Sequence, residues 1–315
     1  MNKKVRMQVG AGTSGGWIAE RRILGIMAAI FAVLLLLGTF LDLTLAKALY
    51  SPNNVVATWI TTIGIYPFAA AVVLFLGVQC ERVAHSTKTK PAKTALVAIM
   101  AVSALLVGFV GAASLLDGDC LGSIIPAVKD NRLVALALSP IIEWPLFLVG
   151  WKLAARNDDK LLLKRSVCFV LVLLAAFAFM QLTKGIFNRP RYRIVADGLE
   201  GVGFVPWFRI SPKPTELMAQ LGLERNEFRS FPSGHALLSI STISILLSLT
   251  WLFPSLRNKR VQLCWAGFGF TVVIIFTRML LGAHYLSDVA AGALLGIAFV
   301  FVYHVLQQRI ERSAQ

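Results

Sequence analysis

Long runs of apolar residues alternate along the whole chain with short segments rich in Lys, Arg, Gly and Pro. Eight of the runs are long enough to cross the roughly 30 Å hydrocarbon core of a bilayer as helices. They are predicted to be helical because a lipid-facing backbone must satisfy its own hydrogen bonds. The pattern therefore predicts an all-α fold, a polytopic transmembrane helical bundle. The predicted spans are residues 23–41, 55–80, 95–116, 133–153, 166–183, 235–253, 263–281 and 287–306.

The fourth predicted span is interrupted by Pro140 and Pro145, and it also contains Glu143. Prolines are tolerated in a membrane helix when neighbouring helices cover the backbone groups that they free. An acid inside a span is a candidate functional residue. Two roles stay open for Glu143: a contribution to substrate or to a buried network, or capping of the backbone near the two prolines.

Composition agrees with a membrane protein, since 57% of the 315 residues are hydrophobic and only 15% are charged. The net charge of +15 would also suit a nucleic-acid-binding protein. However, with a cytoplasmic N-terminus, 19 of the 31 Lys and Arg residues fall in inner segments, and eight of the other 12 fall in one long outer loop. Since Lys and Arg accumulate on the cytoplasmic side, both termini are predicted to be cytoplasmic. The charge is explained by topology, and no nucleic-acid partner is expected.

A single membrane domain is predicted over residues 1–315, because no repeat or soluble domain is visible. It comprises a cytoplasmic tail (1–22), four amino-terminal spans (23–165) and a carboxy-terminal core (166–308). Within the core, the loop 184–234 is longer than a passive connection requires, and loops of this length are usually functional or disordered. Its aromatic stretch 203–208 fits either an interfacial contact or an irregular loop with a small core of its own.

Polar residues able to do chemistry gather in three clusters at the outer ends of the last four spans. On the predicted topology all three face the same side of the membrane. The first cluster contains Lys184, Arg189-Pro190 and Arg191-Tyr192, the second is Ser230-Phe231-Pro232-Ser233-Gly234-His235, and the third contains Thr277-Arg278, Gly282, His284 and Asp288.

These residue types suit a phosphoryl group. The negative charge of such a group is spread over several oxygens, so fixed cations are needed around them. Lys184, Arg191 and Arg278 can supply those cations, and arginine also offers bidentate contacts. The Ser233-Gly234 turn before a helix can add backbone N–H groups and the positive end of the helix dipole.

The histidines suit covalent transfer of that group. His284 and Asp288 are four residues apart and can meet on one helical face. A carboxylate on one imidazole nitrogen fixes the tautomer and leaves the other nitrogen free as a nucleophile. His235 can then act as the general acid for the leaving alkoxide and as the base for water. This chemistry needs no metal or other cofactor.

The clusters together resemble the signature of the type 2 phosphatidic acid phosphatase family, KxxxxxxRP, PSGH and SRxxxxxHxxxD. The resemblance covers roughly residues 184–292 and implies an integral membrane lipid phosphatase. It also implies that His284 is the nucleophile, Asp288 its partner and His235 the acid and base. The phosphate-binding residues that it implies are Lys184, Arg191, Arg278, Ser233 and Gly234.

Two departures from the signature are present. Arg191 has the family spacing from Lys184 but is followed by Tyr192, whereas the literal Arg189-Pro190 pair comes two positions early. Spacing favours Arg191 over Arg189 as the phosphate ligand. Thr277 replaces the signature Ser and keeps its hydroxyl.

The expected reaction is metal-independent hydrolysis of a lipid phosphate or pyrophosphate at the outer face of a cell membrane, of the bacterial inner-membrane or plasma-membrane type. Undecaprenyl pyrophosphate, phosphatidylglycerophosphate, phosphatidate and lipid A phosphates all fit. A phosphotransferase using the same residues is the alternative enzyme. A transporter is the non-enzymatic alternative, although no paired halves with matching interrupted helices are visible.

Overall fold

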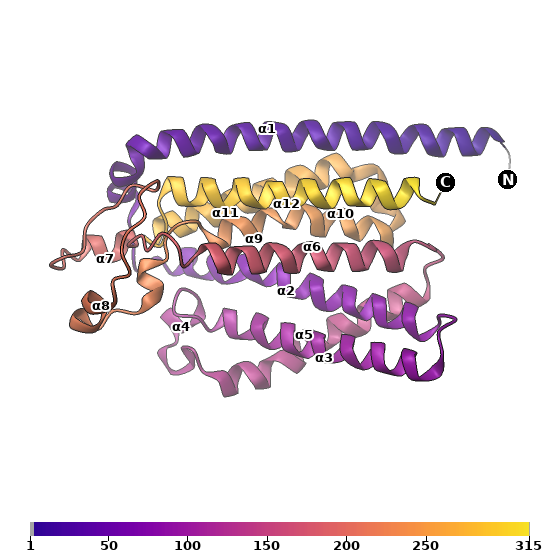
Figure 1. Ribbon diagram of the computed structural model, residues 1–315, viewed down its shortest axis with the longest axis horizontal. Coiled ribbons are helices and arrows are strands. Elements are labelled where there is room, and N and C mark those ends of the chain that lie inside the picture. Colours follow the sequence, from indigo (N-terminus) through magenta and orange to yellow (C-terminus); the bar gives the residue numbers. More distant parts are fainter. Residues whose placement is uncertain (1–2, 315) are drawn as a thin grey trace.

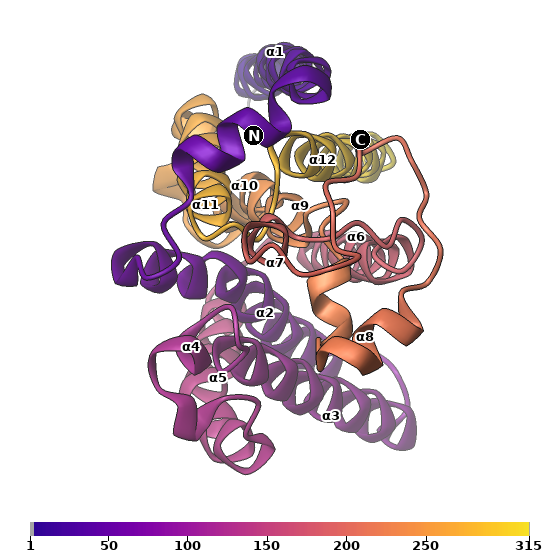
Figure 2. The ribbon, with the colours of Figure 1, turned by 90° about the vertical axis from the view of Figure 1, so that its left-hand side faces the viewer.

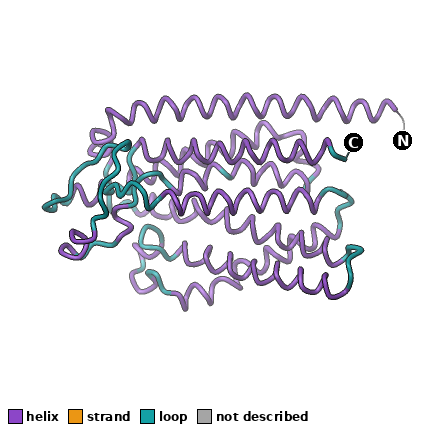
Figure 3. The backbone as a smooth tube through the Cα atoms, in the orientation of Figure 1, coloured by secondary structure: helices purple, strands orange, loops and turns teal. Residues whose placement is uncertain are grey.

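The computed structural model describes residues 3–314, with side chains from Trp17 onward, and this part of the chain is built of helices without any strand (Figures 1 and 3). Three short 3-10 segments lie between them at residues 126–128, 225–228 and 254–259. The helices are α1 (Lys3–Leu49), α2 (Val55–Ala84), α3 (Lys90–Leu115), α4 (Leu121–Ile124), α5 (Arg132–Ala155), α6 (Leu162–Thr183), α7 (Tyr192–Ala196), α8 (Thr215–Leu221), α9 (Gly234–Ile240), α10 (Thr242–Leu252), α11 (Arg260–Leu280) and α12 (Leu286–Arg312).

Eight helical segments are long and apolar enough to cross a membrane, and they coincide with the eight spans predicted from sequence. The predicted all-α bundle is confirmed, and the chain is a multi-pass membrane protein. The sixth span is formed by α9 and α10 together, which are separated only at Ser241. The fourth span, α5, continues as a helix through both Pro140 and Pro145.

The helices pack in two groups, as the end-on view shows (Figure 2). One group consists of α2, α3 and α5, which contact one another extensively. The other surrounds α9 and α10 with α6, α11 and α12, and α1 lies along α12 and α11 on the outside. Helix α2 joins the groups because it also contacts α6, α9 and α11. Large apolar side chains such as Leu36, Leu133 and Leu171 are exposed on the outer surface, as expected for contact with lipid.

The expected tail 1–22 is helical from Lys3, so α1 begins well before its apolar part. From Trp17 onward, this part of the helix packs against the bundle. Glu20 is completely buried and forms an ion pair with Arg260 of α11, and Trp17 donates a hydrogen bond from Nε1 to Glu311 of α12 at 3.2 Å. These contacts fix the amino-terminal side of α1 to the bundle.

Glu143 lies in the interior of the α2, α3 and α5 group, and only 3% of it is exposed. It packs against Gly108 of α3, where an added Cβ would lie 2.9 Å from the Glu143 Cγ. Neither carboxylate oxygen has a hydrogen-bond partner among the described residues. Glu143 therefore makes no described hydrogen bond to a residue of the three sequence clusters.

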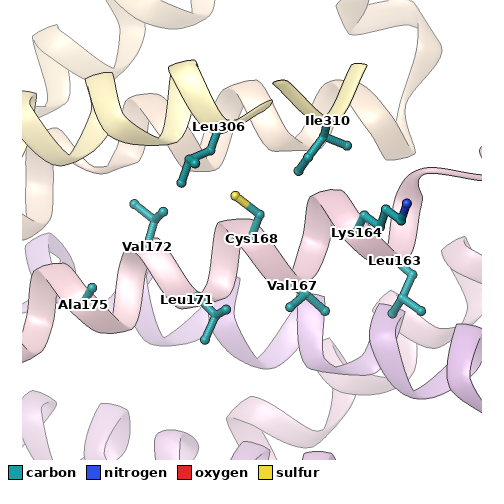
Figure 4. Close-up of a pocket in the computed structure, with 9 residues that line it drawn as sticks. All are labelled: Leu163, Lys164, Val167, Cys168, Leu171, Val172, Ala175, Leu306 and Ile310. Carbon is teal, nitrogen blue, oxygen red and sulfur yellow. The ribbon is translucent and has the colours of Figure 1, made fainter. Parts of the chain in front are cut away.

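The start of α1 and the end of α12 lie at one end of the bundle, and α4, α7, α8 and the long loop lie at the other (Figure 1). An apolar groove of about 580 Å³ runs between α6 and α12 near the end that carries the termini, with Cys168 and Val172 directed toward Leu306 and Ile310 (Figure 4). The three clusters identified from the sequence lie at the opposite end, where α6 and α11 finish and α9 and α12 begin.

Candidate active site

The first and second clusters meet where α6 ends and α9 begins. Lys184 is the residue that caps the carboxyl end of α6, and Gly234 is the first residue of α9. A Cβ added to Gly234 would lie 2.5 Å from Sδ of Met180, and 2.8 Å from Cε and 3.0 Å from Nζ of Lys184. The glycine therefore lets both side chains pack directly against the start of α9, and a larger residue would displace them.

The second and third clusters meet through His284, which is 1% exposed in the turn between α11 and α12. Gly282 has a φ of +62° in this turn, a conformation that glycine adopts without strain. His284 Nδ1 lies 2.7 Å from the Ser230 carbonyl oxygen. A carbonyl can only accept, so Nδ1 carries the proton. Nε2 is then unprotonated, and it is buried without a hydrogen-bond partner among the described residues.

The hydrogen-bond partner of His284 Nδ1 is the Ser230 carbonyl, and Asp288 lies beside the same nitrogen. The Asp288 Oδ2 is 3.8 Å from His284 Nδ1, too long for a hydrogen bond. Asp288 instead accepts hydrogen bonds from the Ser230 hydroxyl and, at 2.8 Å, from the Tyr285 backbone N–H. The backbone carbonyl of Ser230 therefore fixes the His284 tautomer, and Asp288 holds Ser230 and the start of α12 in place.

Arg189 completes the support behind Asp288 and does not reach the centre of the site. Its guanidinium donates to Asp288, to the Asp42 Oδ2 at 2.8 Å and to the Val205 carbonyl oxygen at 2.7 Å. Its carbon Cζ lies 4.2 Å from the centre of the Tyr285 ring. Each of the three guanidinium nitrogens of Arg189 therefore donates to a group of the protein itself.

By its place at the end of the first span, Asp42 could be an ordinary interfacial residue, but the structure buries it. It is 2% exposed and accepts hydrogen bonds from both the backbone N–H and the hydroxyl of Ser287. Burial behind Arg189 explains the difference, since α1 packs beside α12. No pattern in the sequence pairs an acid in the first span with an arginine 147 positions later.

Arg191 and Arg278, both nearly fully buried, lie together on a second acid, Asp119. Arg191 Nη1 donates to Asp119 at 2.6 and 2.9 Å, and Arg278 Nη2 donates to it at 2.7 Å. Arg193 Nη1 also donates to Asp119 at 2.7 Å. Sequence reasoning missed Asp119, because its loop follows α3 and is distant from every cluster along the chain.

The two arginines differ from Arg189 in keeping unused donors. Arg191 Nε, and both Nε and Nη1 of Arg278, are buried without a partner among the described residues. The Nε2 atom of His235, in the first turn of α9, is buried and unpartnered in the same sense. Polar atoms that are buried without partners are costly, and several of those among the described residues belong to the groups that the sequence indicates for phosphate chemistry.

Ser233 has a structural position in the same arrangement. Its hydroxyl accepts from the Ala236 N–H at 3.4 Å and so caps α9, and its backbone N–H donates to the Asp288 carbonyl oxygen at 3.0 Å. The cap places Gly234 and His235 at the beginning of the helix, close to α12.

Burial and charge set the protonation of these groups. Burial, together with the nearby Arg278 and Arg191, lowers the pKa of His284 to about 4, although Asp288 opposes this shift. Burial and the nearby guanidinium groups of Arg191, Arg229 and Arg278 lower the pKa of Lys184 to about 8. At neutral pH His284 is therefore neutral and Lys184 is mostly protonated.

A polar cavity of about 530 Å³ opens next to this centre. Charged and amide side chains line it, including Lys184, Asp119, Arg193 and Asn226. From the loop end of the bundle, the cavity thus reaches Lys184 and the Asp119 carboxylate that binds Arg191 and Arg278.

Residues 165–312 match the family model described as the PAP2 superfamily. This segment contains all three clusters. The match is consistent with a type 2 phosphatidic acid phosphatase, and it supports a phosphatase-type activity on phosphate esters. No match to the chain was found among curated proteins or among solved structures. Asp42 and Asp119, which contact the clusters, both lie outside the matched segment.

Proposed function

We propose that this protein hydrolyses the phosphate or pyrophosphate ester of a membrane lipid through a phosphohistidine on His284. The observation that carries the proposal is the neutral imidazole of His284, with Nδ1 bound to the Ser230 carbonyl and Nε2 buried and free. Such a nitrogen can attack phosphorus without first losing a proton.

In the first step, Nε2 of His284 forms a bond to phosphorus while the bond to the leaving oxygen breaks. His235, in its protonated form, gives its proton to that oxygen, so that the lipid alcohol, or the lipid monophosphate from a pyrophosphate, departs neutralised. In the second step, water gives a proton to His235 and its oxygen bonds to phosphorus. The P–N bond breaks, inorganic phosphate leaves, and His284 is regenerated.

The cations stabilise the charge on the transferred group. Arg278 offers two unused buried N–H donors and Arg191 offers one, while Lys184 supplies a charge at the edge of the polar cavity. Donors that are already in place act strongly where water is excluded. The polar cavity can bring water as far as Lys184, beside the phosphate-binding groups.

A lipid substrate is supported by the apolar surface beside the first cluster. Leu182 and Ile186 are 75% and 48% exposed, and Phe208 and Ile210 of the long loop are each 61% exposed. The Asn188 side chain fixes this part of the loop to the end of α6 by donating to the Ser211 carbonyl at 2.9 Å. The hydrocarbon tail of a lipid can lie against this surface while its phosphate reaches the cations.

We further propose that this end of the bundle faces the outside of a bacterial inner membrane or plasma membrane, with both termini cytoplasmic. The distribution of Lys and Arg supports this orientation. Accessible lipids are then those of the outer leaflet, including undecaprenyl pyrophosphate, phosphatidylglycerophosphate, phosphatidate and lipid A phosphates.

The test is phosphate release from these four lipids by purified protein in detergent with EDTA. His284→Ala should abolish release, and His85→Ala, which alters an exposed histidine away from the clusters, should not. With labelled donor, the label should appear as free phosphate, and transfer to an added acceptor lipid would identify a phosphotransferase instead. Full activity in His284→Ala would refute the proposed nucleophile.

A further inference from the structure

Asp119 lies in the short loop between α3 and α4, outside the segment that matches the PAP2 family. Only 7% of it is exposed. Its Oδ2 accepts hydrogen bonds from Arg191 and Arg278, and its Oδ1 accepts from Arg191 and Arg193. One carboxylate therefore joins an arginine of the first cluster to an arginine of the third.

The role of Asp119 follows from the guanidinium nitrogens of Arg191 and Arg278 that it does not contact. It binds Nη1 of Arg191 and Nη2 of Arg278, while Nε of both residues and Nη1 of Arg278 stay buried and unused by the described residues. A carboxylate that stood in the place of the phosphate would occupy the donors intended for phosphate. Asp119 holds the arginines by other nitrogens and leaves those donors available.

Charge gives the physical reason for such a residue. Arg191, Arg278 and Lys184 carry like charges in a buried region, and each acts on the others electrostatically. Without an anion they would repel one another and turn toward solvent. Arg193 does not add to this excess, because it is also paired with Glu227. Charge-assisted hydrogen bonds to one fixed carboxylate oppose the repulsion while the site is empty.

We propose that Asp119 is a positioning residue of the phosphatase site, whose carboxylate orients Arg191 and Arg278 so that their remaining N–H groups face the transferred phosphoryl group. The inference rests on the proposed function. It also gives the amino-terminal spans a part in the reaction, since the loop that follows α3 completes the geometry of the carboxy-terminal half.

The test compares Asp119→Asn with the wild type and with Asp158→Asn. The first substitution keeps the shape of the side chain but removes the charge that holds the guanidinium groups. Asp158 is exposed in the loop between α5 and α6, outside the polar cavity and without a described hydrogen bond to any of these arginines. We expect kcat to fall about 10- to 100-fold in Asp119→Asn, as for small misplacements of catalytic groups, with a smaller change in KM and no change in Asp158→Asn.

A second readout separates positioning from a general loss of structure. The negative charge of Asp119 raises the pKa of Lys184 against the effects of burial and the arginines. Removing that charge should therefore move the pH at which inhibition by inorganic phosphate weakens to a lower value. A fall in activity that parallels a loss of thermal stability, with this pH unchanged, would reduce Asp119 to a structural residue.

Two further outcomes would also overturn the inference. Faster turnover with tighter inhibition by phosphate in Asp119→Asn would make Asp119 a competing anion. Unchanged kcat in Asp119→Asn, with His284→Ala inactive, would refute the role of Asp119 and leave the proposed function intact. If His284→Ala were fully active, the proposed function itself would fail, so the two failures are distinguishable.

Discussion

Replacing Arg189 should damage the stability of the protein more than replacing Arg191, although both are buried arginines of the first cluster. Arg189→Ala removes the guanidinium that pairs with both Asp42 and Asp288. Two carboxylates that are almost completely buried would then lose their counter-charge. Breaking one buried ion pair costs about 3–5 kcal/mol, so a loss at the upper end of that range is expected.

Arg191→Ala leaves its carboxylate better supported, because Asp119 keeps hydrogen bonds from Arg193 and Arg278, each at 2.7 Å. The loss is then nearer that of a charge-assisted hydrogen bond, about 1.5–3 kcal/mol. Its phosphatase activity should nevertheless be almost abolished, because a donor to the phosphoryl group is missing.

The assay is reversible unfolding of both variants in mixed detergent micelles containing increasing SDS, together with phosphate release at low SDS. Adding Asp42→Asn to Arg189→Ala should cost less than the sum of the two single changes, because the double variant has one unpaired charge fewer. The reasoning is refuted if Arg189→Ala unfolds like the wild type, or if Arg191→Ala is the less stable of the two.

Three further outcomes are expected. Gly234→Ala should weaken inhibition by inorganic phosphate about 10-fold or more. The new Cβ would lie 3.0 Å from Lys184 Nζ and displace it, so that the lysine loses a charge-assisted contact with phosphate. Equal inhibition of the variant and the wild type would contradict the position of Lys184 in the site. Between pH 7.5 and 10, phosphate inhibition should weaken as the pH rises through the Lys184 pKa of about 8, because the protonated lysine binds the anion. Lys184→Arg should remove this pH dependence. A similar pH dependence in Lys184→Arg would exclude Lys184 as the titrating group. Ser230→Ala removes the hydroxyl that donates to Asp288 but keeps the backbone carbonyl that binds His284. The kcat of phosphate release should therefore fall far less than in His284→Ala. An inactive but folded Ser230→Ala would show that the bond to Asp288 matters more than the carbonyl.

Sequence alone determined the class of fold and the identity of the main chemical groups. The length of the apolar runs predicts eight helices, because a run of about twenty apolar residues spans hydrocarbon as a helix that satisfies its own backbone. The spacing of Lys184 and Arg191 selected Arg191 over Arg189, and the structure gives the two arginines different surroundings: Arg191 keeps a free donor beside Arg278, while Arg189 has none.

Tertiary structure decided which groups hold the clusters in place. The carbonyl that fixes the His284 tautomer belongs to Ser230, and a backbone oxygen has no signature in a sequence. The acids that balance the buried arginines, Asp42 and Asp119, come from α1 and from the loop after α3. Their roles depend on how separate helices pack, and an ion pair between distant segments is a consequence of packing that local residue patterns do not encode.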